Sequence, residues 1–508
     1  MLSHNTQPAD TIPEWLDALA EAYADRACVT SKERSLSFAD LNRESSGIAR
    51  GLLARGIGKG SRVGLLLGNG PTWVAWWAAV SRIGAVCVPL STFMQPAELG
   101  RVVRHADLQY LVSTQRFLSR NFIALITEAF PELAERPDPG LALSDAPFLR
   151  TIVILDANTE WARNAAWVIE AGRDARWANV LRNASCEVHA DDDAICIYTS
   201  GQSAEPKGVM HTQGTVVAKA HYLSQMLGFT RDTMATATMP FFWVGGLVMS
   251  LLPAMDAGAA TRCPERSTWA AGGAVIGNTL AVSDDAVEHT RGFAKIPALG
   301  MTETFGMYSW GKELVVAEYP IATPLDELQP GFELRLIDER GADVPDGSPG
   351  EIILRGPTVT TRLYKVARSA AFDENGFYRT GDLAVRQGSR ISFVGRKHDM
   401  IKTSGANVSP AEVERELTAI EDVQRAFVVG IDDGDRGQLV AAAVVLRAHA
   451  TLSVEEIQRT LRRRLSPYKV PRAIITLASV DEVPMTPSMK VRKRLLATLI
   501  QARVQSGK

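Results

Sequence analysis

The residue types best suited to chemistry in this chain of 508 residues are concentrated just after an apolar run of strand-forming residues, 194–198. The segment that follows holds three hydroxyl side chains, two glycines and a lysine: Thr199, Ser200, Gly201, Ser203, Lys207 and Gly208. Glycines allow backbone N–H groups to approach a ligand closely, and successive N–H groups in a turn form a concave anion site. With Lys207 as a point positive charge, the segment predicts a phosphate-binding loop. An ordinary polar surface loop is the alternative, since the Gly-Lys-Ser/Thr triplet of nucleotide hydrolases is absent from it.

The elements that must position this loop alternate between helix and strand. Helical periodicity spans residues 12–55, and Ser37 is placed to cap the second helix there. Apolar runs, each expected to be a strand, follow at residues 62–70, 85–89, 110–112 and 151–155. Because these runs are apolar throughout, they are typical of parallel strands buried on both faces, which indicates an α/β fold. The proline-containing stretch 131–148 is expected to be a surface excursion.

Composition narrows the function classes. The net charge of −2 gives no electrostatic footprint for nucleic acid. The cysteines and histidines show no metal-ligand or Cys-x-x-Cys spacing, which indicates buried thiols in a reducing compartment. No apolar run reaches the roughly 18 residues of a membrane span. A cytoplasmic protein without a transmembrane segment is the expectation.

Residues 198–209 resemble the phosphate loop of the adenylate-forming superfamily, which includes acyl-CoA synthetases, peptide-synthetase adenylation domains and luciferases. Further segments are similar to the superfamily's other motifs, in the same order: 239–246, 299–306, 350–356 with 377–383, 393–414 and 483–494. The resemblance covers residues 15–496, and overall similarity is nearest to fatty acyl-CoA synthetases. It implies a large N-terminal domain of several subdomains with parallel-rich sheets and helices, residues 1–395, and a small mobile α+β C-terminal domain, residues 396–508.

The resemblance also implies roles for single residues. The residues expected to bind ATP or AMP are Thr199, Ser200, Gly201, Ser203, Lys207, Gly208, Gly300, Thr302, Asp382 and Arg396. Glu303 would hold Mg²⁺, which prefers hard oxygen ligands between a carboxylate and phosphates. Asp382 would accept hydrogen bonds from the ribose hydroxyls, and an aspartate in a tight turn after Gly381 is the alternative.

The remaining expected site residues concern the acid, the thiol and the catalytic charge. Lys490 matches the catalytic lysine, with Lys207, Glu303 and Lys402 as further catalytic residues. Phe242, Trp243 and Gly245 would line the acid pocket, although an aromatic core cluster explains them equally well. Lys402 and Gly405 would face the CoA channel, and His398 would be the hinge.

Two departures from the family pattern stand out. Gln202 and Ala204 replace a hydroxyl residue and a glycine in the phosphate loop. Between about residues 264 and 298 the chain is shorter than the pattern by several tens of residues, in the part that shapes the acyl pocket.

The function expected from these features is an AMP-forming acid–thiol ligase that uses ATP, Mg²⁺ and CoA. An apolar acid, fatty or aromatic, would become acyl-AMP and then a CoA thioester. The alternatives are an enzyme that loads a separate carrier protein and a catalytically impaired nucleotide-binding homologue. The expected partners are the small-molecule acid, ATP and CoA, with no nucleic acid, and a homodimer is one option for assembly.

Overall fold

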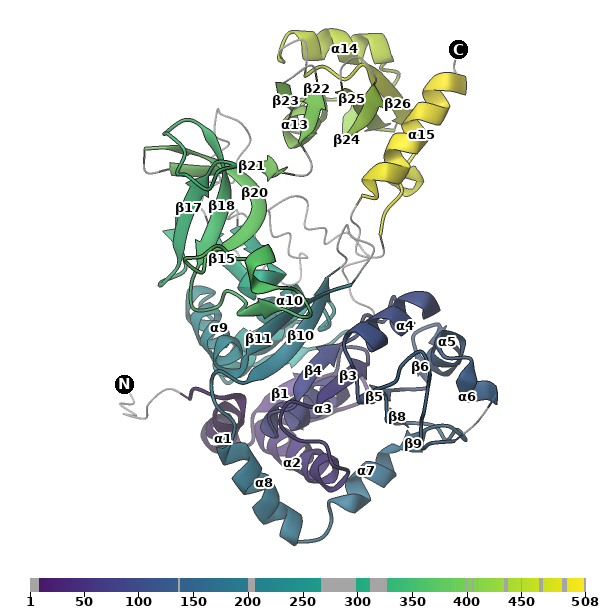
Figure 1. Cartoon of the computed structure of the whole chain (residues 1–508), viewed down its shortest axis with the longest axis vertical. Coiled ribbons are helices and arrows are strands. Elements are labelled where there is room, and N and C mark those ends of the chain that lie inside the picture. Colours follow the sequence, from purple (N-terminus) through teal and green to yellow (C-terminus); the bar gives the residue numbers. More distant parts are fainter. Residues whose placement is uncertain are drawn as a thin grey trace. The chain divides into compact units, whose positions relative to one another are not determined.

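The structure is a computed structural model that describes residues 9–135, 138–199, 206–265, 298–310, 327–388, 390–397, 400–403, 406–408, 410–433, 437–448, 450–465, 469–486 and 491–506. The chain divides into two compact units. Figure 1 labels the helices and strands of both. The first holds Met1–Tyr308 and Gly356–Glu374, and the second holds Ser309–Arg355 and Asn375–Lys508. The domain boundary expected between residues 395 and 396 falls inside the second unit and stays a prediction.

The first unit is built around an eight-stranded sheet. Its strands, in spatial order, are β19 (Arg362–Leu363), β11 (Lys207–Thr212), β10 (Asp193–Thr199), β4 (Val86–Pro89), β3 (Arg62–Leu66), β5 (Tyr110–Ser113), β8 (Thr151–Ile154) and β9 (Arg163–Asn164). Neighbours are parallel from β10 to β9, while β11 runs antiparallel to both β10 and β19. The expected parallel-rich sheet is therefore confirmed.

Both faces of this sheet are buried, which explains why its strands read as continuous apolar runs. Val63 and Leu65 of β3 point into one hydrophobic core, and Leu66 points into another on the opposite face. Helices with residues in the first core include α1 (Ile12–Tyr23), α2 (Phe38–Ala54), α3 (Pro71–Arg82) and α9 (Gln213–Met226). Helices with residues in the second core are α4 (Pro96–His105), α5 (Phe122–Ala129) and α6 (Glu132–Glu135).

Local sequence signals mark the helix starts as expected. The Ser37 side chain caps α2 by accepting from the Asp40 N–H, and the Asp40 carboxylate accepts in return from the Ser37 N–H. The tryptophan-rich segment between the apolar runs 62–70 and 85–89 forms α3, with Pro71 in its first turn.

Smaller elements complete the first unit. A second sheet has the order β12 (Met234–Thr236), β13 (Ala260–Arg262), β1 (Ala27–Thr30) and β2 (Ser35–Ser37). The other elements are the hairpin β6 (Arg116–Phe117) and β7 (Arg120–Asn121), α7 (Ala165–Ala171), α8 (Arg176–Cys186), α10 (Val244–Gly246), a π-helix (Leu247–Leu251), α11 (Leu252–Asp256), β14 (Ala298–Met301), and the 3-10 turns Thr302–Thr304 and Arg368–Ala370.

Most of the described residues in the stretch 131–148 are exposed, as expected for a surface excursion, but the stretch is also anchored in the core. It contains α6, and Leu133, Leu141 and Leu143 are buried in the second core. The prolines in this stretch predict a loop. The leucines between them are buried, because they pack into the second core.

The second unit contains a four-stranded antiparallel sheet. Its order is β17 (Glu333–Ile337), β18 (Pro349–Arg355), β20 (Tyr378–Gln387) and β21 (Arg390–Arg396). The end of β15 (Gly306–Trp310) pairs in the same unit with β16 (Glu327–Leu328).

A five-stranded sheet with helices on both faces follows in the second unit. Its strands are β23 (Ala406–Val408), β22 (Ile401–Thr403), β25 (Gly437–Leu446), β24 (Val423–Asp433) and β26 (Ala473–Leu477). Alternate residues of β25 enter two cores, one with α13 (Pro410–Thr418) and α14 (Val454–Arg462), the other with the 3-10 turn Val480–Glu482 and α15 (Lys493–Ser506). This is the α+β arrangement expected for the C-terminal part.

Candidate functional site

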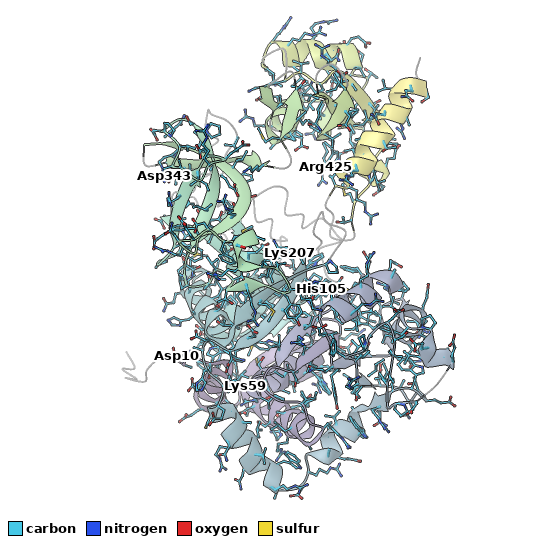
Figure 2. All side chains as sticks on the ribbon, in the orientation of Figure 1. Asp10, Lys59, His105, Lys207, Asp343 and Arg425 are labelled. Atoms are coloured by element: carbon cyan, nitrogen blue, oxygen red, sulfur yellow. The ribbon has the colours of Figure 1, made fainter. Side chains whose placement is uncertain are left out.

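The predicted phosphate loop joins two antiparallel strands. Thr199 is the last residue of β10 and Lys207 is the first of β11, and the two are partners across the ladder. The hairpin therefore presents the Lys207 side chain beside the loop's start (Figure 2). Ser200, Gly201 and Ser203 lie outside the described residues.

Gly208 does not have the special backbone conformation expected of it. It is a buried residue of β11 whose φ lies outside the left-handed region. A Cβ atom there would lie 2.9 Å from the Cys196 Sγ and 3.1 Å from the Tyr198 Cζ. The glycine is thus needed because it leaves room for the Tyr198 ring on the neighbouring strand.

Tyr198 is in turn fixed by the end of α4. Its hydroxyl lies 2.8 Å from the His105 Nδ1, and the two rings meet edge to face. Burial raises the pKa of the Tyr198 hydroxyl, so the hydroxyl stays protonated. This contact, which the sequence did not indicate, anchors the strand end from which the loop departs.

Glu303 lies in the 3-10 turn that follows β14, and its carboxylate is paired with the Lys207 ammonium. The Glu303 side chain is 8% exposed and that of Lys207 is 30% exposed, so the pair borders solvent. Gly300, on β14, must be a glycine because an added Cβ would lie 2.7 Å from the Gly306 carbonyl oxygen. Thr302 begins the turn, and its carbonyl oxygen accepts a 2.7 Å hydrogen bond from the His211 Nε2.

The donor set at this turn fits a cation that arrives with a nucleotide. Among the described residues, no group of three or more His, Cys, Asp and Glu side chains could hold a metal ion. A single buried carboxylate suits Mg²⁺ when phosphates supply the other ligands of the ion. Glu303 is the residue that would hold it.

The segment after Met239 combines core and non-core aromatic rings. Phe241 packs against Trp73 in the first core, with 5.2 Å between ring centroids. The buried Phe242 and the half-buried Trp243 contact each other at 5.3 Å, and both contact Phe93, which lies in the loop after β4. Phe93 is a candidate pocket residue that the sequence did not indicate.

Asn69 holds the backbone of the same segment. Its side-chain amide donates to the Met239 carbonyl at 2.9 Å and accepts from the Phe241 N–H at 2.8 Å. Gly245 faces Met239, because an added Cβ would lie 2.9 Å from the Met239 Cε. The loop after β3 therefore sets the position of the aromatic segment.

In the second unit, Asp382 is a buried residue of β20. Gly381 has a φ of +71°, at a point where the pairing of β18 with β20 shifts register. The tight turn considered as the alternative for Asp382 is thus wrong, because the glycine forms a bulge inside a strand. Arg396 ends β21 opposite Asp382 in the ladder.

Glu351 braces this bulge and was missed from the sequence. Its buried carboxylate accepts from the Gly381 N–H at 3.3 Å and from the Lys397 ammonium at 3.0 Å. Glu351 is the residue after the glycine that opens the 350–356 motif, which is the one signal that pointed toward it.

Several predicted site residues cannot be placed. Lys490, His398 and Gly405 lie outside the described residues, as does nearly all of the segment 264–298 that is expected to be shortened. Lys402 is the middle residue of β22, and only its backbone is described.

Comparison with known proteins defines the class. The family described as AMP-binding enzyme matches residues 16–276, and its C-terminal domain matches residues 412–490. An indoleacetate–CoA ligase of Aromatoleum aromaticum is 28% identical over 522 residues, covering 95% of this chain and 96% of that protein. A mitochondrial medium-chain acyl-CoA ligase of Danio rerio is 24% identical over 544 residues, covering 97% and 89%.

The fold agrees with that class. The crystal structure of an anthranilate CoA ligase in complex with anthranoyl-AMP superposes with a TM-score of 0.76 at 20% identity, over 99% of this chain and 100% of that one. The expected class, an AMP-forming acyl-CoA synthetase of the adenylate-forming superfamily, is confirmed. The chain belongs to the AMP-binding enzyme family. Within the described residues, no helix has the length and apolar character needed to cross a membrane.

Proposed function

We propose that this chain activates an apolar carboxylic acid, fatty or aromatic, as acyl-AMP and transfers the acyl group to CoA. One observation carries the proposal: Asn69, Phe93 and the loop after Thr199 follow the carboxyl ends of three adjacent parallel strands, β3, β4 and β10. Carboxyl ends of parallel strands meet at one edge of the sheet, where ligands of α/β proteins bind. The aromatic segment held by Asn69 therefore lies at the same sheet edge as the phosphate loop.

The chemistry follows from that placement. A carboxylate oxygen of the acid attacks the α-phosphorus of ATP, and the bond from that phosphorus to the pyrophosphate oxygen breaks. Lys207 neutralises phosphate charge as it develops, and Lys490 adds a second cation. Magnesium, when bound, supplies Lewis-acid charge neutralisation. In the second step the CoA sulfur attacks the acyl carbon, its thiol proton is lost, and AMP leaves.

The class of acid is supported by the side chains of the candidate pocket. Phe93, Phe242 and Trp243 present aromatic faces and no charge. The names of the relatives include both an arylacetate and medium-chain acyl groups. These acids share an apolar body attached to the carboxylate. CoA as acceptor is supported by the same names.

The remaining roles are proposals that come from the family resemblance. They are ATP or AMP contacts by Gly300, Thr302, Asp382 and Arg396, a hinge at His398, and thiol-channel roles for Lys402 and Gly405. A cytoplasmic location and a homodimer belong to the same set.

The deciding experiment is ATP–pyrophosphate exchange with a panel of fatty, aryl and arylacetic acids, with Lys490→Ala as the matched inactive variant. Exchange that depends on one class of acid and is lost in the variant would establish adenylation and name the substrate class. Thioester formation on addition of CoA would then separate a CoA ligase from an enzyme that loads a carrier protein. A folded protein that binds ATP but exchanges with no acid would contradict the proposal and favour a catalytically impaired homologue.

A further inference from the structure

His211 lies on β11 four residues after Lys207, so both side chains project from the same face of the strand. The intervening Met210 projects from the other face, into the second core. His211 is fully buried. A polar ring at such a position needs a hydrogen-bond partner, and its partner is the turn that carries Glu303.

The hydrogen bond from His211 has a fixed direction. Its Nε2 lies 2.7 Å from the Thr302 carbonyl oxygen, which can only accept, so the Nε2 carries the proton. Burial lowers the pKa of His211 to about 4, so the ring is neutral near pH 7. No partner is found for the other ring nitrogen, Nδ1, within the described residues. The hydrogen bond to the Thr302 carbonyl is thus the polar interaction that the His211 ring makes.

The same ring supports a strained residue at the end of the turn. Phe305 has φ 51° and ψ 49°, the left-handed region that a residue with a side chain rarely adopts. Its ring packs on the His211 ring with 4.7 Å between centroids. His211 therefore touches the turn at both ends, through a hydrogen bond at Thr302 and through ring contact at Phe305.

The segment 358–360 also holds the turn. The Glu303 carbonyl accepts from the Thr360 N–H at 2.6 Å, and the Thr304 carbonyl accepts from the Thr358 hydroxyl at 3.1 Å. Three successive carbonyls, of residues 302, 303 and 304, are each bonded to a group outside the turn. With its backbone fixed in this way, the turn directs the Glu303 side chain toward Lys207.

We propose that His211 is a positioning residue, which holds the turn 302–305 so that the Glu303 carboxylate faces Lys207 and a nucleotide-borne cation. This inference rests on the proposed role of Glu303 in the adenylation step. It assigns to a fully buried histidine outside the predicted site an effect on Mg²⁺ and ATP that is transmitted through the turn 302–305.

The test compares three variants of the full-length protein. His211→Gln keeps a donor that can reach Thr302, His211→Phe keeps the ring contact without a donor, and His211→Asn carries an amide too short to reach. Calorimetric MgATP binding, the Mg²⁺ concentration for half-maximal pyrophosphate exchange and the thermal midpoint are measured for each. We expect the Phe and Asn variants to need about tenfold more Mg²⁺, the effect of one lost hydrogen bond, and the Gln variant to stay within about threefold of wild type.

The outcomes separate this inference from the function on which it rests. Wild-type protein that binds no MgATP and exchanges with no acid would overturn the proposed function and the inference together. If wild type binds MgATP and shows acid-dependent exchange, and the Phe and Asn variants bind MgATP equally well, the function stands and the inference falls. Equal loss in all three variants, in step with their thermal midpoints, would also overturn it, since His211 would then only stabilise the fold. If the Phe variant does not fold, the comparison of Gln with Asn decides.

Discussion

At the scale of single residues, the Lys207–Glu303 ion pair allows the role of the Glu303 charge to be tested. Glu303→Gln keeps the shape of the side chain and removes the carboxylate. We expect pyrophosphate exchange to fall about 100-fold, because the charge that would hold the cation is lost. The thermal midpoint should change little, since Lys207 is 30% exposed and can be hydrated instead. Steady-state exchange and a melting curve check both, and a variant with wild-type exchange would remove Glu303 from the mechanism.

Lys219 of α9 is a second charged residue with a testable consequence. It is fully buried, its ammonium nitrogen donates to the Met307 carbonyl at 2.8 Å, and burial lowers its pKa from 10.5 to about 7. Between these two pH values the unfolded chain binds more protons than the folded one, so this group makes stability rise with pH. Below pH 7 both states are protonated and its contribution is constant.

Lys219→Met, which keeps an unbranched side chain and removes the ammonium group, should abolish that slope. The free energy of unfolding of wild type minus that of the variant should be flat below pH 7 and rise above it by up to about 1.4 kcal/mol per pH unit. Chemical denaturation of both proteins from pH 6 to 9 measures the difference. Parallel stability profiles would show that Lys219 is charged in the folded state.

Which site residues could be predicted depended on whether their role is local. Lys207 and Glu303 are charged residues within recognisable sequence motifs, so both could be predicted as site residues from the sequence. His211, Asn69 and Glu351 act through partners 91, 172 and 46 residues away along the chain. Only the folded chain brings such pairs together, so single-sequence reasoning had no signal for them.

At the scale of elements, the loop after β3 controls the segment that lines the candidate acid pocket. Asn69→Ala removes both hydrogen bonds to the Met239–Phe241 backbone. At about 1 kcal/mol each, their loss should raise KM for the acid by up to roughly 30-fold while KM for ATP stays near wild type. Asn164→Ala is the matched control, because it removes the capping side chain of α7 far along the chain. Equal effects of the two variants on KM for the acid would count against a positioning role for Asn69.

Strands and helices were predicted where local physics decides them. Runs such as Arg62–Leu66 and Thr151–Ile154 are apolar because both faces of the sheet are covered. The start of α2 could be predicted from Ser37, because its capping interaction involves only the nearby Asp40. The strained Phe305 and the buried leucines of 131–148 depend on packing against distant strands, and no periodicity in their own segments indicates it.

At the scale of the whole molecule, the chain matches two family domains, residues 16–276 and 412–490. The resemblance gives Lys490 a role in adenylation only, and gives Gly405 a role in thiol access only. The two half-reactions should therefore separate by variant. Lys490→Ala should lower pyrophosphate exchange by about 1,000-fold, because a cation that meets developing phosphate charge is lost. The same variant should still convert supplied acyl-AMP and CoA to thioester at near the wild-type rate.

Gly405→Leu should show the reverse pattern, since a bulky side chain would obstruct the thiol without touching the phosphates. Its exchange rate should stay near wild type, and thioester formation from supplied acyl-AMP should fall. Rapid-quench measurement of each half-reaction, with wild type as reference, resolves the two steps. If either variant slows both half-reactions equally, the same arrangement of residues must catalyse both steps. That result would contradict the proposed movement about His398.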